Sequence, residues 1–355
     1  MFKPSANPPS RFEEMHVEWD EEAPPARLHV YDDDSKSILA KNDSPDLPFT
    51  WSLNPYRGCS HACIYCYARP SHEYLGWGAG TDFDTRIVVK RNAAALLTAA
   101  FDAPRWEGES ILFSGNTDCY QPLEFRLGLT RACLEVCLRY RNPVNVITKS
   151  NLIERDVDLL VSLHRAARVH VTLSIPYFDP ALARAIEPGA PTPARRLRAL
   201  RTLSDAGIPV GVNVAPVIPG VNDKEIPAVL KAARDAGATR AGLIMVRLPG
   251  PVAPYFEQRI REALPLRAEG VLARIRRARG GRLNDPNFGT RMRGGGEEWA
   301  ATERLFHVWC DKLGYTPRSN MEGPQPEGAS TFRRPTAPPR PGSQLALFRG
   351  FPGGS

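Results

Sequence analysis

One short segment carries most of the information in this 355-residue sequence: Asn54-Pro-Tyr-Arg-Gly-Cys59-Ser-His-Ala-Cys63-Ile-Tyr-Cys66-Tyr-Ala-Arg69. Its cysteines stand at positions i, i+4 and i+7, directly after an apolar stretch at 49–53 that predicts a β-strand. A glycine-containing loop at the end of a strand can gather three thiolates. Structural zinc sites generally use four ligands, and no second Cys-x-x-Cys pair follows in this sequence. A 4Fe–4S cluster normally takes four cysteines, so three would leave one iron open to a ligand that is not protein.

Apolar strands and amphipathic helices alternate along the middle of the chain. Short β-branched stretches predict six strands, at 49–53, 110–113, 144–148, 169–174, 210–214 and 242–246. Helical patterns follow at 123–141, 157–167, 193–206, 224–236 and 254–279. Strands separated by helices predict a parallel sheet of the α/β class. About six such units are too few for an eight-stranded barrel, which leaves a partial barrel or a doubly wound sheet. Either architecture binds its ligand at the carboxyl ends of the strands.

Composition divides the chain into four regions. Residues 1–44 predict a polar, acidic N-terminal extension, 45–290 the core, 291–313 a C-terminal helix, and 314–355 a disordered tail rich in proline and glycine. The formal net charge is +7, and residues 240–293 hold twelve arginines against four acids. This basic region is either a solvated surface or a surface that meets phosphate.

The location of the protein is predicted from what the sequence lacks. No run approaches the roughly 18 apolar residues that span a bilayer, and the N-terminus has no apolar signal core. Seven cysteines, three of them within eight residues, do not suggest a disulfide framework. We therefore expect a cytoplasmic protein with no membrane partner, and a metal or cluster site in a reducing compartment.

The Cys-x3-Cys-x2-Cys spacing, with Tyr65 before the third cysteine, resembles the radical S-adenosylmethionine superfamily. Within it, residues 69–76, 87–92, 114–124 and 216–223 resemble uncharacterised proteins that are similar to spore photoproduct lyase. The resemblance implies a partial (β/α)6 barrel of the TIM type and a 4Fe–4S cluster on Cys59, Cys63 and Cys66. It also implies that S-adenosylmethionine is cleaved reductively to a 5′-deoxyadenosyl radical, which abstracts hydrogen from a substrate. A reductant such as flavodoxin or ferredoxin would supply the electron.

The same resemblance implies a set of cofactor-binding residues. The loop after the second strand holds the methionine amino group in this superfamily, and Ser114, Gly115, Asn116 and Thr117 occupy that place, although the common Gly-Gly-Glu wording is absent. The alternative is an ordinary strand–helix turn. Lys149 and Ser174 match residues that bind the cofactor carboxylate, the alternative for Lys149 being a side chain that extends to solvent. Tyr65 would lie beside the adenine and Asn213 near the ribose.

The substrate is predicted less directly. Spore photoproduct lyase returns hydrogen from a cysteine just upstream of the matching aspartate, but here Gly115 lies upstream of Asp118 and Cys119 follows it. This departure argues against an identical reaction, and Cys119 is either a catalytic hydrogen donor or a buried thiol. Arg247, at the end of the sixth strand, would meet an anionic substrate group or pair with a local acid. We expect a lyase-like enzyme that acts on damaged DNA. The alternatives are radical modification of RNA or a peptide, or a non-catalytic iron–sulfur or zinc module that binds nucleic acid.

The tail contains one apolar island, Gln344-Leu-Ala-Leu-Phe348. Its pattern resembles the pentapeptide with which bacterial polymerases and repair proteins bind the DNA sliding clamp. An apolar island in a solvated segment is either without function or a docking motif. The sequence therefore offers the sliding clamp as a candidate partner in DNA repair.

Overall fold

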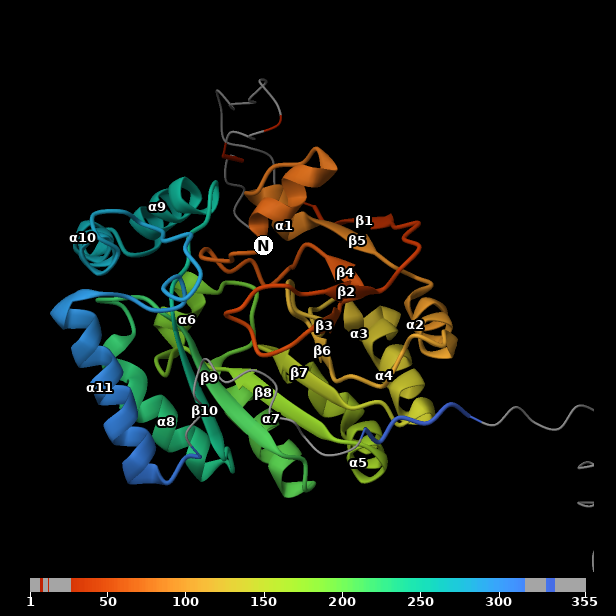
Figure 1. The fold of residues 1–355 in the computed structure, drawn as a ribbon. Coiled ribbons are helices and arrows are strands. Elements are labelled where there is room, and N and C mark those ends of the chain that lie inside the picture. The colour runs from red at the N-terminus through yellow and green to blue at the C-terminus, as the bar shows by residue number, and fades with distance from the viewer. Residues whose placement is uncertain (1–6, 9–11, 13–26, 317–329, 336–355) are drawn as a thin grey trace, which may run out of the picture.

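The computed structural model describes residues 7, 8, 12, 27–316 and 330–335, and its centre is a seven-stranded sheet (Figure 1). The strand order is β10-β9-β8-β7-β6-β3-β2. The six parallel strands are β3 (Trp51–Leu53), β6 (Ile111–Phe113), β7 (Val144–Thr148), β8 (Val169–Ser174), β9 (Val210–Val217) and β10 (Arg240–Met245). At one edge, β2 (Leu39–Lys41) pairs antiparallel with β3. The order is linear, so the sheet is an open, partial barrel. The six predicted strands and the fold class are confirmed.

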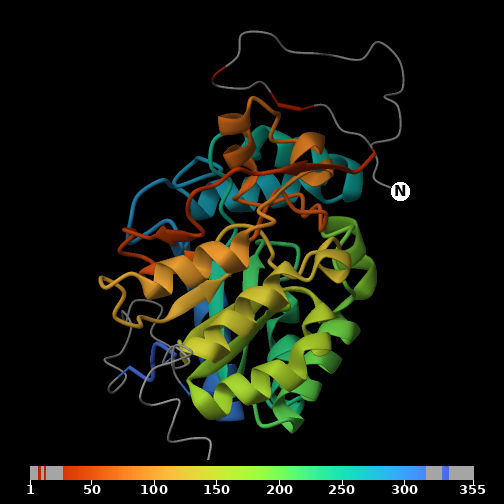
Figure 2. The ribbon, with the colours of Figure 1, turned by 90° about the vertical axis from the view of Figure 1, so that its right-hand side faces the viewer.

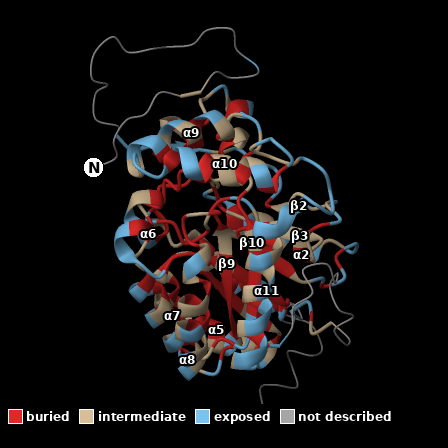
Figure 3. Cartoon of the chain, turned by 90° about the vertical axis from the view of Figure 1, so that its left-hand side faces the viewer, coloured by how far each residue is buried: buried red, intermediate tan, exposed pale blue. Residues whose placement is uncertain are grey.

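Helices cover the outer face of this sheet (Figure 2). They are α2 (Ala93–Asp102), α4 (Leu129–Tyr140), α5 (Val157–Ala166), α7 (Pro193–Asp205), α8 (Ile226–Asp235) and α11 (Gly296–Leu313). Figure 3 shows buried strands inside a shell of helices whose outer sides are exposed. Most residues of the parallel strands are buried, as is usual for parallel sheets that helices cover. The predicted C-terminal helix corresponds to α11.

Two predicted helices are each interrupted in the structure. The helix expected over 123–141 divides into α3 (Glu124–Leu127) and α4 at Gly128, whose φ of +64° is left-handed. Glycine adopts that conformation readily, so it ends one helix and begins the next. The helix expected over 254–279 divides into α9 (Val252–Ala263) and α10 (Ala268–Ala278). Pro265 lies between them, and its missing N–H cannot continue a helix.

A second, three-stranded sheet lies at one end of the larger sheet (Figure 1). It contains β1 (His29–Asp32), β5 (Arg86–Val89) and β4 (Tyr56–Arg57) in the order β1-β5-β4. The 3-10 helix η1 (Arg69–Leu75) and α1 (Thr81–Thr85) accompany it. Because β1 pairs with β5 and β2 with β3, residues 27–44 belong to the folded body over most of their length. The polar, acidic composition predicted an extension there, with one strand-like stretch at 27–31 that overlaps β1.

Shorter helices connect the remaining units. They are η2 (Asn151–Asp156), α6 (Pro180–Ile186) and η3 (Asp223–Glu225). Asp179 accepts a hydrogen bond from the Ala181 amide at 2.7 Å and so caps α6. No helix among the described residues is both long and apolar enough to cross a membrane.

Part of the C-terminal region packs on the body of the protein, in contrast to the disordered tail that composition predicted. Phe332 is 8% exposed and lies against Phe101 and Tyr140, with ring centroids 5.7 and 6.1 Å apart. Arg334 donates hydrogen bonds of 2.7–3.0 Å to the carbonyls of Phe101, Ala103 and Trp106. We call residues 330–335 the tail anchor. Its packing depends on Phe101 and Tyr140, which are far apart in the sequence but have ring centroids 5.3 Å apart in the fold, an arrangement that local composition cannot reveal. The motif at 344–348 lies outside the described residues.

Candidate active site

The three cysteines of the Cys-x3-Cys-x2-Cys motif lie in one tightly turned loop after β4. Cys59 and Cys63 are buried and Cys66 is half-buried. Successive backbone turns shape the loop: Ala62 N donates to Cys59 O and Cys66 N to Cys63 O, both at 3.2 Å. Ala62 has a φ of +54°, which is unusual for a residue with a side chain and typical of functional sites that hold strain. The fold therefore brings all three thiols into one buried segment.

The chemistry of these thiols fits a bound iron–sulfur cluster. Burial raises the pKa of Cys63 to about 12, and burial with the neighbouring Asp118 raises that of Cys59 as well. The thiolate is the form that ligates metal, so these buried sulfurs would lose their protons on binding a cluster. Within the described ranges, no three His, Cys, Asp or Glu side chains surround one point as a single ion requires. Three cysteines on three separate irons of a cluster need not meet at one point.

Arg69 supports the backbone of the cysteine loop through hydrogen bonds. Its guanidinium is fully buried and donates to the Cys63 carbonyl at 2.9 and 3.3 Å. It also donates to the carbonyls of Ala79 and Gly80 and forms a two-point ion pair with Asp84, at 2.9 and 3.1 Å. All of its donors are thereby used inside the protein. Arg69 supports the loop through its backbone and is not available to a cofactor.

Gly189 closes the other side of the loop. Its amide donates to the His61 carbonyl at 3.0 Å, and a Cβ built on it would stand 2.1 Å from the Ser60 carbonyl oxygen. We expect Gly189→Ala to lower the free energy of unfolding by about 1–3 kcal/mol, because the new methyl must displace loop backbone. Urea unfolding of the protein without cluster measures this. Gly270→Ala is the matched control: Gly270 lies exposed in α10 with open space around it, so alanine should stabilise the protein by about 0.5–1 kcal/mol. Equal effects of the two changes would contradict the close packing.

Asp118, in the loop after β6, links the cysteine loop to the end of β7. Its carboxylate accepts from the Thr148 hydroxyl at 2.7 Å and the Lys149 amide at 2.8 Å, both at the end of β7. On the other side His61 Nδ1 lies 3.4 Å away. His61 is 2% exposed, and its Nε2 is buried without a hydrogen-bond partner among the described residues. Burial lowers the pKa of His61, so the ring is neutral and is packed against this carboxylate.

Tyr65 is held by a buried ion pair that the sequence did not reveal. Its hydroxyl donates to Glu187, which pairs with Arg196 on α7. Arg196 also donates to the carbonyls of Ser174 and Pro191 at 3.0 and 2.8 Å. Burial raises the pKa of Glu187, but Arg196, Lys149 and the hydrogen bond from Tyr65 together more than offset this, so the pKa lies below its usual value. The ionised pair therefore fixes Tyr65, and with it the cysteine loop, to the end of β8.

Lys149 and Ser174 lie at the carboxyl ends of adjacent strands, whereas Asn213 lies in the middle of β9, which continues to Val217 instead of ending at Val214. Lys149 follows β7, and Ser174 at the end of β8 is in register with Asn213 on β9. The Lys149 ammonium lies 5.8 Å from the centre of the Tyr65 ring. Burial lowers the pKa of Lys149, but Cys63 and Glu187 raise it by more, so the side chain is charged. The structure thus brings these four predicted residues together beside the cysteine loop.

In the loop after β6, the backbone is more available to a cofactor than most of the side chains are. Ser114 has a φ of +94°, and its hydroxyl donates to the Ile147 carbonyl at 2.6 Å. The Thr117 hydroxyl donates to the Tyr56 carbonyl at 3.0 Å. The Gly115 carbonyl accepts from Tyr67, and Asn116 is exposed. Any cofactor contact from residues 114–117 therefore depends mainly on the left-handed backbone and on Asn116.

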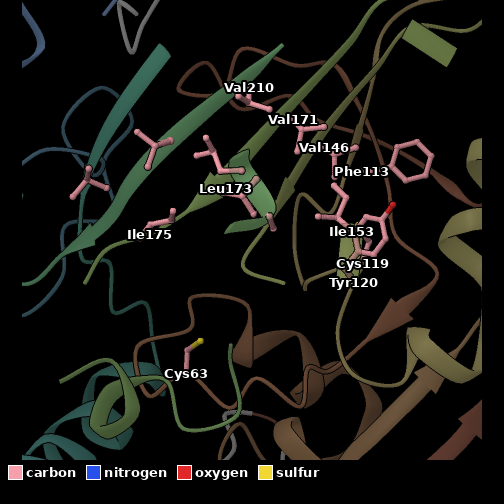
Figure 4. Close-up of a cluster of buried hydrophobic side chains, with 14 of the residues drawn as sticks. Cys63, Phe113, Cys119, Tyr120, Val146, Ile153, Val171, Leu173, Ile175 and Val210 are labelled. Carbon is pink, nitrogen blue, oxygen red and sulfur yellow. The ribbon is translucent and has the colours of Figure 1, made fainter. Parts of the chain in front are cut away.

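Cys119 lies in the hydrophobic core. It is fully buried, and Figure 4 shows it beside Tyr120 and Ile153, while Cys63 stands apart with its sulfur directed toward the strands. Burial raises the pKa of Cys119 well above its usual value. A hydrogen atom, which a neutral thiol can donate, would have to leave from this packed position. The catalytic role of Cys119 stays a prediction.

Comparison with known families identifies this arrangement. Residues 53–233 match the model of the Radical SAM superfamily, a span that contains the three cysteines and strands β4–β9. The chain belongs to this superfamily. Its members are enzymes that bind S-adenosylmethionine and a 4Fe–4S cluster and need a reductant, so these are the cofactors expected from the motif.

Relatives with similar sequences carry no assigned function. The radical SAM chain is 39% identical over 224 residues to the uncharacterized protein Rv2578c of Mycobacterium tuberculosis, covering 62% of this chain and 66% of that one. It is 33% identical over 173 residues to the uncharacterized protein MJ0683 of Methanocaldococcus jannaschii, covering 49% and 62%. The match thus spans slightly less than two thirds of the length of these relatives.

Solved structures share the fold at low sequence identity. Spore photoproduct lyase complexed with dinucleoside spore photoproduct superposes with a TM-score of 0.56 at 17% identity, covering 81% of this chain and 80% of that one. A variant of that lyase with bound AdoMet and the same dinucleoside gives 0.55 over the same coverage. The radical SAM chain therefore has the fold of spore photoproduct lyase.

Proposed function

We propose that this radical SAM enzyme holds its 4Fe–4S cluster on Cys59, Cys63 and Cys66 and acts on a nucleic-acid substrate, damaged DNA first. The observation that carries the cluster assignment is the buried three-cysteine loop, braced by Arg69 and Gly189 at the carboxyl ends of the parallel strands. When bound, the reduced cluster supplies the electron that breaks the C5′–S bond of S-adenosylmethionine, giving methionine and a 5′-deoxyadenosyl radical. The likeness to a lyase complexed with a dinucleoside photoproduct supports the substrate class.

The protein's own residues bind and orient the cofactor in this proposal. The charged Lys149, with Ser174 on the next strand, binds the cofactor carboxylate. Residues 114–117 hold the methionine amino group, Asn213 contacts the ribose, and Tyr65 lies beside the adenine. The Glu187–Arg196 pair sets the position of the Tyr65 ring. Cys119 remains the candidate that returns hydrogen to a product radical, as a lyase-like reaction needs.

The test is anaerobic reconstitution with iron and sulfide, followed by dithionite reduction in the presence of S-adenosylmethionine. We expect iron and sulfide to bind and 5′-deoxyadenosine to form. Flavodoxin or ferredoxin should replace dithionite as electron donor. Zinc bound without sulfide, and no cleavage, would support the non-catalytic nucleic-acid-binding module. If RNA or a peptide stimulates cleavage and ultraviolet-damaged DNA does not, the substrate is RNA or a peptide and not damaged DNA.

We also propose that the motif at 344–348 binds the DNA sliding clamp. Eight residues separate Gln344 from Pro335, the last residue of the tail anchor, which ties the motif to the body of the enzyme. We expect the Leu347→Ala, Phe348→Ala variant to lose clamp capture in a pull-down, because these side chains supply the apolar contacts of such a motif. A Ser343→Ala variant should bind as the unaltered chain does. Equal capture by all three proteins would exclude clamp binding through this motif.

A further inference from the structure

Most arginines in the basic region 240–293 are used inside the protein. Arg279 is buried and donates to the carbonyls of Val246, Thr290, Arg291 and Arg293. Others pair with carboxylates, in the pairs Arg259–Glu262, Arg261–Glu269, Arg274–Asp223, Arg276–Glu257, Arg277–Glu298 and Arg291–Asp46. The excess of arginine in this region is therefore largely neutralised locally and does not form one phosphate-binding surface.

Arg247 differs from these arginines. It follows β10, is half-buried, and forms no ion pair with a carboxylate in the part of the chain that the structure describes. Its Nε is buried without an acceptor, and its Nη1 has only the Met292 sulfur at 3.7 Å. Burial, with Arg291 nearby, lowers the pKa of Arg247, and Tyr67 and Asp46 offset this only in part. A guanidinium held in this way lacks an anionic partner.

The position of Arg247 places that unmet charge beside the candidate active site. Its guanidinium carbon lies 5.6 Å from the centre of the Tyr67 ring. Tyr67 follows Cys66 directly, and its hydroxyl donates to the Gly115 carbonyl at 2.9 Å, in the loop proposed to hold the cofactor amino group. The Tyr67 residue is 46% exposed. An unpaired guanidinium and an exposed aromatic ring thus stand together next to the cysteine loop.

We infer that Arg247 and Tyr67 form a substrate-binding site for a phosphodiester group and its neighbouring base. The inference rests on the proposed function, and it names the site that recognises the nucleic acid. A guanidinium presents donors in a planar fork that matches phosphate oxygens. Exposed tyrosine rings stack on bases of single-stranded or unstacked nucleic acid. An anionic peptide would satisfy Arg247 but would make no use of the exposed ring, so nucleic acid is the favoured class.

The test measures binding of a fluorescent single-stranded oligothymidylate to the reconstituted full chain by anisotropy, over a range of salt concentrations. We expect Arg247→Gln to weaken binding about tenfold, the effect of one charged hydrogen-bonded contact. The slope of log affinity against log salt should fall by about 0.7, as for one lost phosphate contact on a single strand. The matched control, Arg261→Gln, makes the same charge change on α9 at an exposed arginine paired with Glu269 and should leave both quantities unchanged. Tyr67→Leu should weaken binding without changing the slope.

The outcomes separate this inference from the proposed function. Equal binding by Arg247→Gln and the unaltered chain overturns the inference, as does displacement of the oligonucleotide by polyglutamate at equal concentration. Formation of 5′-deoxyadenosine is measured on the same samples without oligonucleotide. If cleavage occurs but no oligonucleotide binds, the radical chemistry stands and the nucleic-acid site is wrong. If oligonucleotide binding depends on Arg247 but no cleavage occurs, the site stands and the radical function fails.

Discussion

Cys59→Ala protein, reconstituted anaerobically, is expected to lose the cluster and the cleavage of S-adenosylmethionine together. With three cysteines in the motif, removal of one leaves two protein ligands for a cluster that normally takes four cysteines. The visible absorbance and electron paramagnetic resonance of the cluster should disappear, and 5′-deoxyadenosine should fall below detection. Cys133→Ala is the control, because Cys133 is an equally buried thiol in α4, outside the cysteine loop. It should keep both signals. Full cleavage by the Cys59 variant would refute the site assignment.

Arg196→Leu is expected to produce the largest loss of stability. The substitution leaves Glu187 charged, buried and without its partner, which typically costs about 3–5 kcal/mol. Urea unfolding of the reduced protein without cluster measures the loss. Two residues along the same helix, Arg198 pairs with Glu154 at the surface. Arg198→Leu should therefore change stability little, and an equal loss for both variants would contradict the assigned role of the buried pair.

A double variant distinguishes a missing partner from general damage to the core. When Glu187→Met accompanies Arg196→Leu, no buried charge is left unpaired, and much of the stability should return. Tyr65 then loses its acceptor. The double variant should consequently stay folded but take up the cluster less completely than the unaltered chain. Stability no better than that of Arg196→Leu alone would show that the side chains act through packing.

The sequence predicted those features that depend on neighbouring residues. The six parallel strands appear as β-branched stretches, and the cysteine spacing marks the loop and the superfamily. Gly128 and Pro265 also mark the helix breaks, although the longer periodicity outweighed them in the prediction. The partners of Arg69 and Tyr65 were not predictable, because the Arg69–Asp84 ion pair and the hydrogen bond from Tyr65 to Glu187 join segments by tertiary packing. Two- to four-residue strands such as β4 and β1 are likewise defined by their partner strand.

The predicted site residues also divide into those that strand order reveals and those that depend on tertiary packing. Lys149 and Ser174 could be placed together because parallel strands end at the same edge of a sheet. Asn213 lies beside Ser174 in the middle of β9, because that strand is longer than its β-branched stretch suggested. The hydroxyls of Ser114 and Thr117 could not be excluded as ligands from sequence, since their acceptors are carbonyls of other strands. Arg247 resembles eleven neighbouring arginines in the sequence. Its half-buried position beside Tyr67, without a carboxylate partner among the described residues, becomes visible only in the fold.

The tail anchor has a consequence for how the chain reaches its native state. The Phe332 ring packs against Phe101 and Tyr140, at the end of the barrel where β6 and β7 begin. During synthesis, Phe101 and Tyr140 are made more than 190 residues before Phe332. Chains that end early therefore present an uncovered aromatic surface, a feature that chaperones and proteases recognise in unfinished proteins.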